Sequence, residues 1–268
     1  MIGSIITEVR DSIDFNESEL QKNSLAYVPA PEDVIFPMTP QTLEVSDEAT
    51  VKVLRQASEE HKPVFVCYTP ESVDQSNAKG RAGVICRVLK LLEISEGNTT
   101  AFLMPGPLAT IERYIRKTPP VRVMAKVYFS KTSQNEGENV EMMALIQSVK
   151  DIYLKIVEEF SDDPKDLKAG LESLPDQRLA LYFMCCHSPL SVDQKFDVLQ
   201  AIDFKQQCLN AVRYFSQTYQ LMGIKAEVQR ATHEELSRQQ REHFLRQQMQ
   251  SIQNELGGTA AVSYTPLS

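Results

Sequence analysis

The sequence predicts an α+β protein, with a β-rich region over residues 25–131 and an all-α region over residues 140–257. Apolar runs and strict alternation, which are typical of strands, fill the first region. In the second region apolar residues recur at spacings of three and four, as on one face of a helix. No proline occurs between residues 203 and 266, which permits one long final helix that begins near residue 204.

Three patterns predict the strands. Residues 63–68 form a compact apolar run, which indicates a strand that is buried on both faces. The run over 84–94, a turn and a return up to Met104 indicate a hairpin. Residues 121–130 alternate between apolar and polar positions, which indicates a half-buried strand.

One helix interrupts these strands. Ser46 is predicted as its N-cap, because a serine hydroxyl can accept a hydrogen bond from a free N–H group of the first turn. Val51 and Leu54 begin its apolar stripe, and residues 61–63 end it.

Polar segments separate the remaining parts. Residues 1–24 show no sustained period and are interpreted as a weakly structured arm. Residues 132–139 are interpreted as a linker, and helices follow from Val140 onward. Residues that favour helix starts precede or open the later helices at Asp163, Pro175, Ser191 and Asp203.

The long final helix changes character along its length. Residues 238–243 are all polar, and apolar residues then resume at Leu245, Met249 and Ile252. A polar stretch between apolar ends cannot be buried against one small core. Two interpretations stay open: a helix that leaves its domain and meets a second body, or a helix with one solvated stretch.

Composition excludes several classes of protein. The chain has 28 basic and 36 acidic residues, a net charge of −8, which disfavours binding to nucleic acid and to anionic membranes. The longest apolar run, Leu179–Cys186, is far below the roughly 20 residues of a membrane span. The N-terminus lacks the pattern of a secretory signal. Five cysteines, an odd number, indicate reduced thiols in the cytoplasm.

Motifs for catalysis are missing or weak. The sequence contains no phosphate-binding loop and no Gly-x-Ser-x-Gly motif. Ser76 and Lys79 match Ser-x-x-Lys, but in a polar segment that favours a surface loop over a nucleophile–base pair. Cys185, Cys186 and His187 cannot converge on one metal ion, because consecutive helical residues point about 100° apart. We therefore predict no catalytic, cofactor-binding or metal-binding residues in this chain.

Binding surfaces remain. Exposed loops and edge strands of the β region could bind an extended peptide by strand addition. Met38, Met104 and Met124 could offer adaptable contacts, although the core is the favoured position for each.

A family resemblance rests on the segment Arg241–Gly257, whose residues Arg-Glu-His-Phe-Leu-Arg-Gln-Gln-Met and Ile-Gln-Asn-Glu-Leu-Gly resemble a signature of the Lon family of ATP-dependent proteases. Phe36-Pro37 and the run Ala82–Leu92 are similar to earlier family segments. Val28–Glu32 and Gly106–Ala109 depart from the family pattern. The binding preference of the β region therefore cannot be transferred from the family.

The resemblance implies a PUA-like β-rich domain that recognises substrates, followed by a helical bundle with a long helix. In the family, an ATPase module of the AAA+ type, which uses ATP and Mg, and a protease domain with a Ser-Lys dyad follow this region. The sequence stops before both, so we interpret it as truncated, artificially or naturally. Residues 258–268 do not resemble the acidic stretch that usually follows, and foreign terminal residues are one explanation that stays open. As the resemblance implies, the partners are unfolded, damaged or regulatory proteins and the other subunits of a homohexamer, and the fragment hydrolyses neither ATP nor peptides.

Two groups of residues are predicted to make these contacts. Glu48 and Lys52, on the exposed side of the first helix, are candidates for contact with substrate; a plain solvated face is the alternative. Candidates for contact with a neighbouring subunit or the ATPase module lie on the final helix: Phe244, Leu245, Met249 and Ile252. Two rival functions stay open, a stand-alone adaptor derived from such a region and an RNA-binding PUA-like module, which the net charge disfavours.

Overall fold

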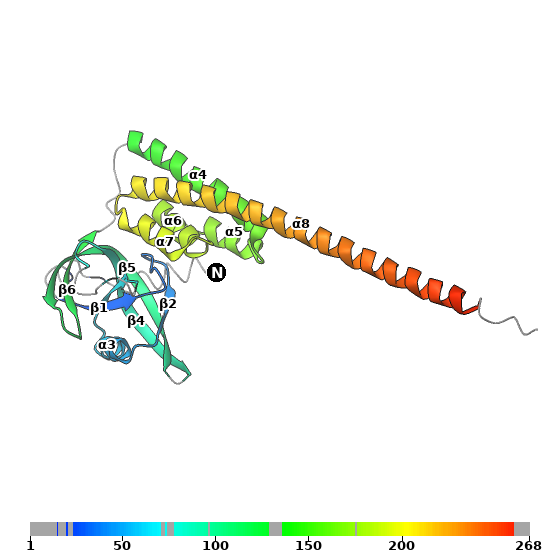
Figure 1. Ribbon diagram of the computed structural model, residues 1–268. Coiled ribbons are helices and arrows are strands. Elements are labelled where there is room, and N and C mark those ends of the chain that lie inside the picture. The colour runs from blue at the N-terminus through cyan, green and yellow to red at the C-terminus, as the bar shows by residue number, and fades with distance from the viewer. Residues whose placement is uncertain are drawn as a thin grey trace, which may run out of the picture. The chain divides into compact units, whose positions relative to one another are not determined.

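The computed structural model describes residues 15, 20, 24–70, 73, 78–95, 97–128, 136–174 and 176–259. The chain divides into two units, Met1–Tyr219 and Gln220–Ser268. The first unit holds a β-barrel and a helical bundle, and the α+β prediction is confirmed (Figure 1). The strands are β1 (Leu25–Ala30), β2 (Gln41–Val45), β3 (Val64–Tyr68), β4 (Ala82–Ser95), β5 (Asn98–Arg116) and β6 (Arg122–Tyr128). The helices are α3 (Glu48–Glu59), α4 (Glu136–Phe160), α5 (Pro164–Glu172), α6 (Gln177–Cys186), α7 (Val192–Gln200) and α8 (Phe204–Thr259).

Five strands close into a ring. The sheet order is β2-β5-β4-β3-β1-β6, and β5 also pairs with β6. The long strand β5 makes this closure possible, because Thr99–Leu103 pairs with β2 while Leu108–Arg116 pairs with β6. Among the described strands, β1 and β3 are the one parallel pair, and the connection between them carries β2 and α3, since parallel neighbours require a crossover. Strand β2 stays outside the ring, on β5.

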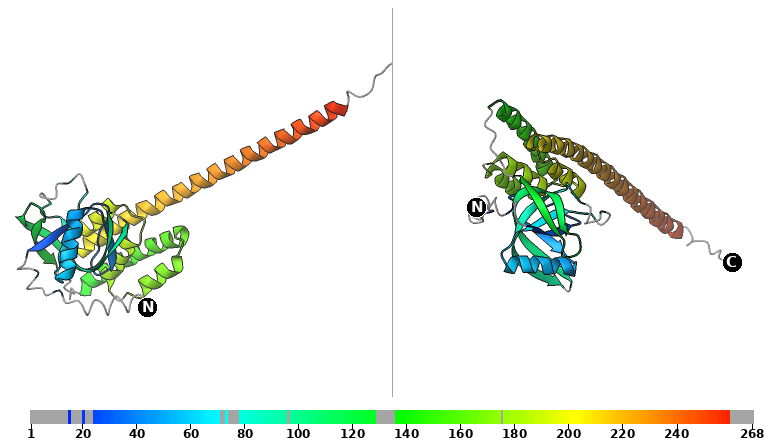
Figure 2. Two further views of the ribbon diagram at one scale, coloured as in Figure 1. Left: turned by 90° about the horizontal axis from the view of Figure 1, so that it is seen from below. Right: turned by 90° about the vertical axis from the view of Figure 1, so that its left-hand side faces the viewer.

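The barrel core explains the strand patterns in the sequence. All five residues of β3 are buried, as predicted for the compact run. In β6, Val123 and Ala125 point into the core whereas Arg122 and Lys126 do not, which confirms the alternation. Helix α3 lies on the side of the barrel away from α4–α7, with Leu54 fully buried (Figures 1 and 2).

Several predicted boundaries are wrong. The N-cap of α3 is Asp47, not Ser46, since its carboxylate accepts a hydrogen bond from the Thr50 N–H at 2.8 Å. Helix α4 begins at Glu136, inside the predicted linker, because the apolar period marks only its packed part. In the predicted arm, Leu20 is buried in the barrel core, and Phe15 packs against that core.

The bundle consists of α4–α7 and the first part of α8. Tyr153 of α4 and Phe215 of α8 meet edge to face with ring centroids 5.9 Å apart, and both are fully buried. Ser191 caps α7 with the predicted capping box. Asp176 caps α6; Pro175, the predicted start, lies outside the described residues. Among the described residues, no helix combines the length and hydropathy of a membrane span.

Specific contacts join the barrel to the bundle. The Tyr68 hydroxyl of β3 donates to Asp193 Oδ1 of α7 at 2.8 Å. The Ala82 N–H of β4 donates to Gln200 Oε1 at 2.8 Å, and Gln200 Nε2 donates to the Gly80 carbonyl at 3.0 Å. These contacts fix the side of the barrel that faces α7.

The second unit is described by itself as the helical segment that begins at Gln220. None of its residues from 220 to 252 is buried.

Candidate functional site

An apolar surface lies on one face of the sheet formed by β2, β5 and β4. Its exposed side chains are Leu89, Leu92, Ile94 and Phe102, and we call this set the open sheet face. Ile94 is 71% exposed and Phe102 is 37% exposed. Large apolar side chains gathered on one exposed face often mark a binding surface.

The strand register explains why these side chains share a face. Phe102 lies opposite Thr42 on one side and Lys90 on the other, and these cross-strand neighbours point to the same face. The next pair along the strands, Leu43 and Ala101, points to the opposite face and is buried. A bulge between Val88 and Lys90 inserts Leu89, which is 51% exposed.

A cavity of about 380 Å³ adjoins the open sheet face. Leu89 and Phe102 form its apolar wall, and Thr42 of β2 lies beside them. The end of α6 contributes Cys186 and His187, so both the barrel and the bundle build the cavity. The hydrogen bonds between the barrel and α7 therefore also fix how the barrel wall of this cavity lies relative to the wall from α6.

Polar groups that line this cavity include the His187 imidazole, the Cys186 thiol and the Asp33 carboxylate. His187 Nδ1 lies 3.0 Å from the Phe183 carbonyl, which can only accept, so Nδ1 carries the hydrogen and Nε2 remains available. Burial raises the pKa of the Cys186 thiol well above its usual value, which keeps it neutral. Asp33 adds one carboxylate, whose Oδ1 accepts from the Val34 N–H at 2.8 Å.

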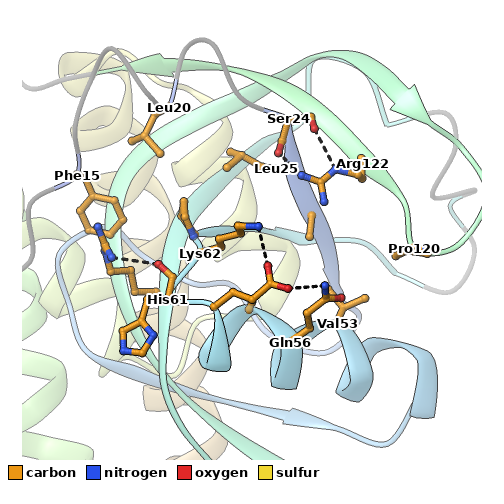
Figure 3. Close-up of a pocket in the computed structure, with 15 residues that line it drawn as sticks. Phe15, Leu20, Ser24, Leu25, Val53, Gln56, His61, Lys62, Pro120 and Arg122 are labelled. Carbon is orange, nitrogen blue, oxygen red and sulfur yellow. Dashed lines mark hydrogen bonds and ion pairs between the residues drawn. The ribbon is translucent and has the colours of Figure 1, made fainter.

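A second cavity, of about 670 Å³, lies between α3 and β1 (Figure 3). Its cationic side chains are engaged by the protein itself. Arg122 donates to the Ser24 hydroxyl at 2.9 Å, Lys62 pairs with Glu60 at 2.7 Å, and Arg87 donates to the His61 carbonyl at 3.3 Å. We therefore place the candidate binding site at the open sheet face and its cavity.

The predicted substrate contacts Glu48 and Lys52 lie elsewhere. They form an ion pair of 2.7 Å along α3, and this pairing lowers the pKa of the Glu48 carboxyl. Both side chains are exposed, and neither lines the cavity beside the open sheet face. Their contact with substrate stays a prediction.

The predicted contacts on α8 fall into two groups. Leu245, Met249 and Ile252 are exposed and follow spacings of four and three. The same heptad phase extends back to Leu221, and we call this stripe the helix seam; its positions are Leu221, Ile224, Val228, Ala231, Glu235, Arg238, Glu242, Leu245, Met249, Ile252 and Leu256. Phe244 is exposed as well, but it lies about 100° from the stripe.

Charged residues interrupt the helix seam at its centre. Arg238 donates to Glu235 Oε1 at 2.9 Å, three residues earlier on the same face. Within the polar segment predicted from the sequence, Arg238 and Glu242 therefore occupy positions of the same stripe as the apolar residues. They separate two apolar halves of one seam.

Other sequence predictions can now be placed. Cys185 is buried and its burial raises the pKa to about 12, while its neighbours Cys186 and His187 line the cavity. The described residues contain no cluster of three or more metal-binding side chains. Ser76 lies outside the described residues. Met104 is buried, as favoured, whereas Met38 and Met124 are half-buried.

Sequence reasoning missed the open sheet face. The run 84–94 is almost continuously apolar, so its pattern does not show which side chains are exposed. One signal was available, the length of the hairpin. Leu92 and Ile94 lie near its turn, beyond the part of β4 that belongs to the ring.

Comparison with known proteins gives a consistent result. Residues 24–216 match the family model of the ATP-dependent protease La (LON) substrate-binding domain. The chain is 26% identical over 254 residues to the Lon protease of Flavobacterium johnsoniae, covering 93% of this chain and 31% of that protein. The Lon protease of Parabacteroides distasonis is 25% identical over 262 residues, which is 96% of this chain and 32% of that protein.

A solved structure shows the same fold. The N-terminal domain of Mycobacterium avium complex Lon protease superposes with a TM-score of 0.58 at 17% identity, covering 72% of this chain and 98% of that one. The chain thus spans about a third of the length of the curated relatives.

Proposed function

The chain belongs to the family of LON substrate-binding domains, and from this premise we propose that it recognises and holds unfolded, damaged or regulatory proteins for an ATP-dependent protease. The open sheet face is the observation that carries the proposal. Its four large apolar side chains are exposed in a folded domain, and they offer packing to apolar segments that intact proteins keep buried.

The helix seam supports a second part of the proposal, pairing with another copy of the chain. Apolar residues at spacings of three and four, over about three turns on each side of the central charges, favour a helix–helix contact. The charges of Glu235 and Arg238 supply complementary partners within a pair of such seams. Several weak substrate contacts would then act together, as in the hexamer that the family resemblance implies.

Hydrolysis of ATP and of peptides is proposed for the rest of a longer protein, with ATP and Mg bound outside this chain. This chain contributes binding and assembly, and its proposed location is the cytoplasm. The described part of the site offers apolar contacts, an imidazole and one carboxylate.

A binding measurement tests the recognition of substrates. The probe is a reduced, carboxymethylated protein that cannot refold, and its affinity is followed by fluorescence anisotropy. Phe102→Ser removes the central ring of the open sheet face and is expected to weaken binding about tenfold. Ile115→Ser is the matched control, because Ile115 is also an exposed apolar residue of β5 but lies outside the face. Equal affinities for the wild type and Phe102→Ser would refute this assignment of the site.

Sedimentation tests the pairing. Met249→Asp places a charge in the helix seam and is expected to shift the chain toward monomer, while Leu236→Asp, at an exposed apolar site outside the seam, is expected to leave association unchanged. If both variants associate like the wild type, the seam is not the contact between copies.

A further inference from the structure

Strand β2 is the edge of the sheet. Each of the five ring strands has neighbours on both sides, whereas β2 pairs only with β5 among the described residues. The outer side of Gln41–Val45 therefore presents backbone N–H and C=O groups to an additional strand. An edge of this kind is a template for strand addition.

This edge is only partly protected against pairing. Proteins commonly protect edge strands by short length, charged side chains (lysine above all), proline or a bulge. Strand β2 has five residues, of which Glu44 is charged, and Pro40 precedes it, but the strand contains neither proline nor lysine and its register with β5 is regular from Gln41 to Val45. Five consecutive residues can thus form a short ladder with an incoming chain.

Side chains beside the edge define what an added strand would carry. Thr42 and Glu44 are both exposed and point to the open sheet face, two residues apart. Thr42 is small and lines the cavity, so a large apolar side chain of the added strand can reach over it toward Leu89 and Phe102. This cavity of about 380 Å³ has room for one such side chain.

The carboxylate of Glu44 determines which side chain is preferred at the second position of the added strand. Glu44 lies on β2 itself with an exposed side chain, whereas Asp33 lines the cavity beside Thr42. A basic side chain next to Glu44 lies on the same face of the added strand as the apolar side chain next to Thr42. Since residues on one face of a strand are two apart, the pattern is apolar-x-basic, or its reverse for the opposite strand direction.

We propose that β2 binds an extended polypeptide as an additional strand, and that it prefers a large apolar residue separated by one position from lysine or arginine. The inference rests on the proposed function, because it gives the mode and preference by which the same site holds unfolded proteins. Backbone pairing accounts for the ability to bind many sequences. The cavity and Glu44 determine which of these sequences bind with higher affinity.

Peptides with altered backbones test the mode of binding. A labelled ten-residue peptide containing Phe-x-Lys is compared with two versions that are N-methylated on alternate residues, one set for each edge of the peptide. Strand addition predicts that one set loses at least tenfold in affinity and the other keeps it, because only one edge of the peptide faces β2. If neither set weakens binding, or both do so equally, strand addition is refuted.

A charge reversal tests the preference. Glu44→Lys is expected to weaken Phe-x-Lys binding at least fivefold and to strengthen Phe-x-Glu binding. Glu59→Lys is the control, since it makes the same change of net charge at an exposed site of α3 that is not among the predicted contacts. Equal effects of both variants would overturn the role of Glu44.

The two proposals can fail separately. If the chain binds the carboxymethylated protein through Phe102 but ignores N-methylation, the proposed function stands and strand addition is wrong. If neither the unfolded protein nor any peptide binds, the proposed function itself fails.

Discussion

Gln200 holds two backbone groups of the barrel with one side chain, so its truncation should loosen the joint between barrel and bundle. Gln200→Ala removes hydrogen bonds to the Ala82 N–H at 2.8 Å and the Gly80 carbonyl at 3.0 Å. Ala82 is fully buried, so its N–H loses its partner without gaining water, which costs about 1–3 kcal/mol. Gly80 is exposed and its carbonyl can be hydrated, so that loss is small.

We therefore expect Gln200→Ala to lower the free energy of unfolding by about 2 kcal/mol. Urea unfolding, followed by far-ultraviolet circular dichroism, measures the change. Gln200→Glu keeps an acceptor for the Ala82 N–H and should cost less than half as much. If both variants destabilise the protein equally, or Gln200→Ala has no effect, the loss of a partner for the buried Ala82 N–H does not account for the change in the free energy of unfolding. Gln200→Ala should also weaken peptide binding, because the cavity is built by the barrel and the bundle together.

Further predictions address the core and the thiols. Gly83→Ala should lower the thermal unfolding midpoint strongly, because an added Cβ would lie 2.4 Å from the Val66 carbonyl oxygen; an unchanged midpoint would contradict this close approach. Tyr182→Phe should destabilise by about 1–2 kcal/mol, since it leaves the fully buried Gln207 amide without the hydroxyl that donates to it at 3.2 Å. Combining it with Gln207→Leu should recover most of that loss in urea unfolding, and a purely additive loss would refute the coupling. A thiol reagent at pH 8 should react slowly with the native protein, because burial raises the pKa of the thiols, as at Cys86, and lowers the thiolate fraction; unfolding in urea should make all five reactive.

Sequence patterns predicted the elements best where one face is buried and the other is not. The alternation in β6 is such a case, since Val123 is buried while Lys126 is exposed. The return strand of the hairpin was predicted up to Met104. The strand instead continues to Arg116, and the register shift between Val84 and Cys86, which places Gly106 and Pro107 opposite Ile85, accommodates the missing N–H of Pro107.

Contacts that depend on long-range pairing could not be predicted. Phe15 shows no periodic pattern, yet its ring lies against Gly106, where a Cβ would approach it to 2.5 Å. Similarly, the edge position of β2 follows from which strands close the ring, and no local pattern encodes this closure. The candidate site was missed for the same reason, because the two strands that carry Leu89 and Phe102 define a face only once their register is known.

The charges in the helix seam explain how one stripe can be apolar and still selective. A continuous apolar stripe would pair in several registers with similar energy. In the proposed pairing, Glu235 and Arg238 lose hydration; their ion pair with each other offsets part of that cost, and opposite charges of the second copy must offset the rest. Only registers that align these central charges avoid that penalty. The polar segment that lowers the hydrophobicity of the helix therefore restricts the register in which two copies can meet.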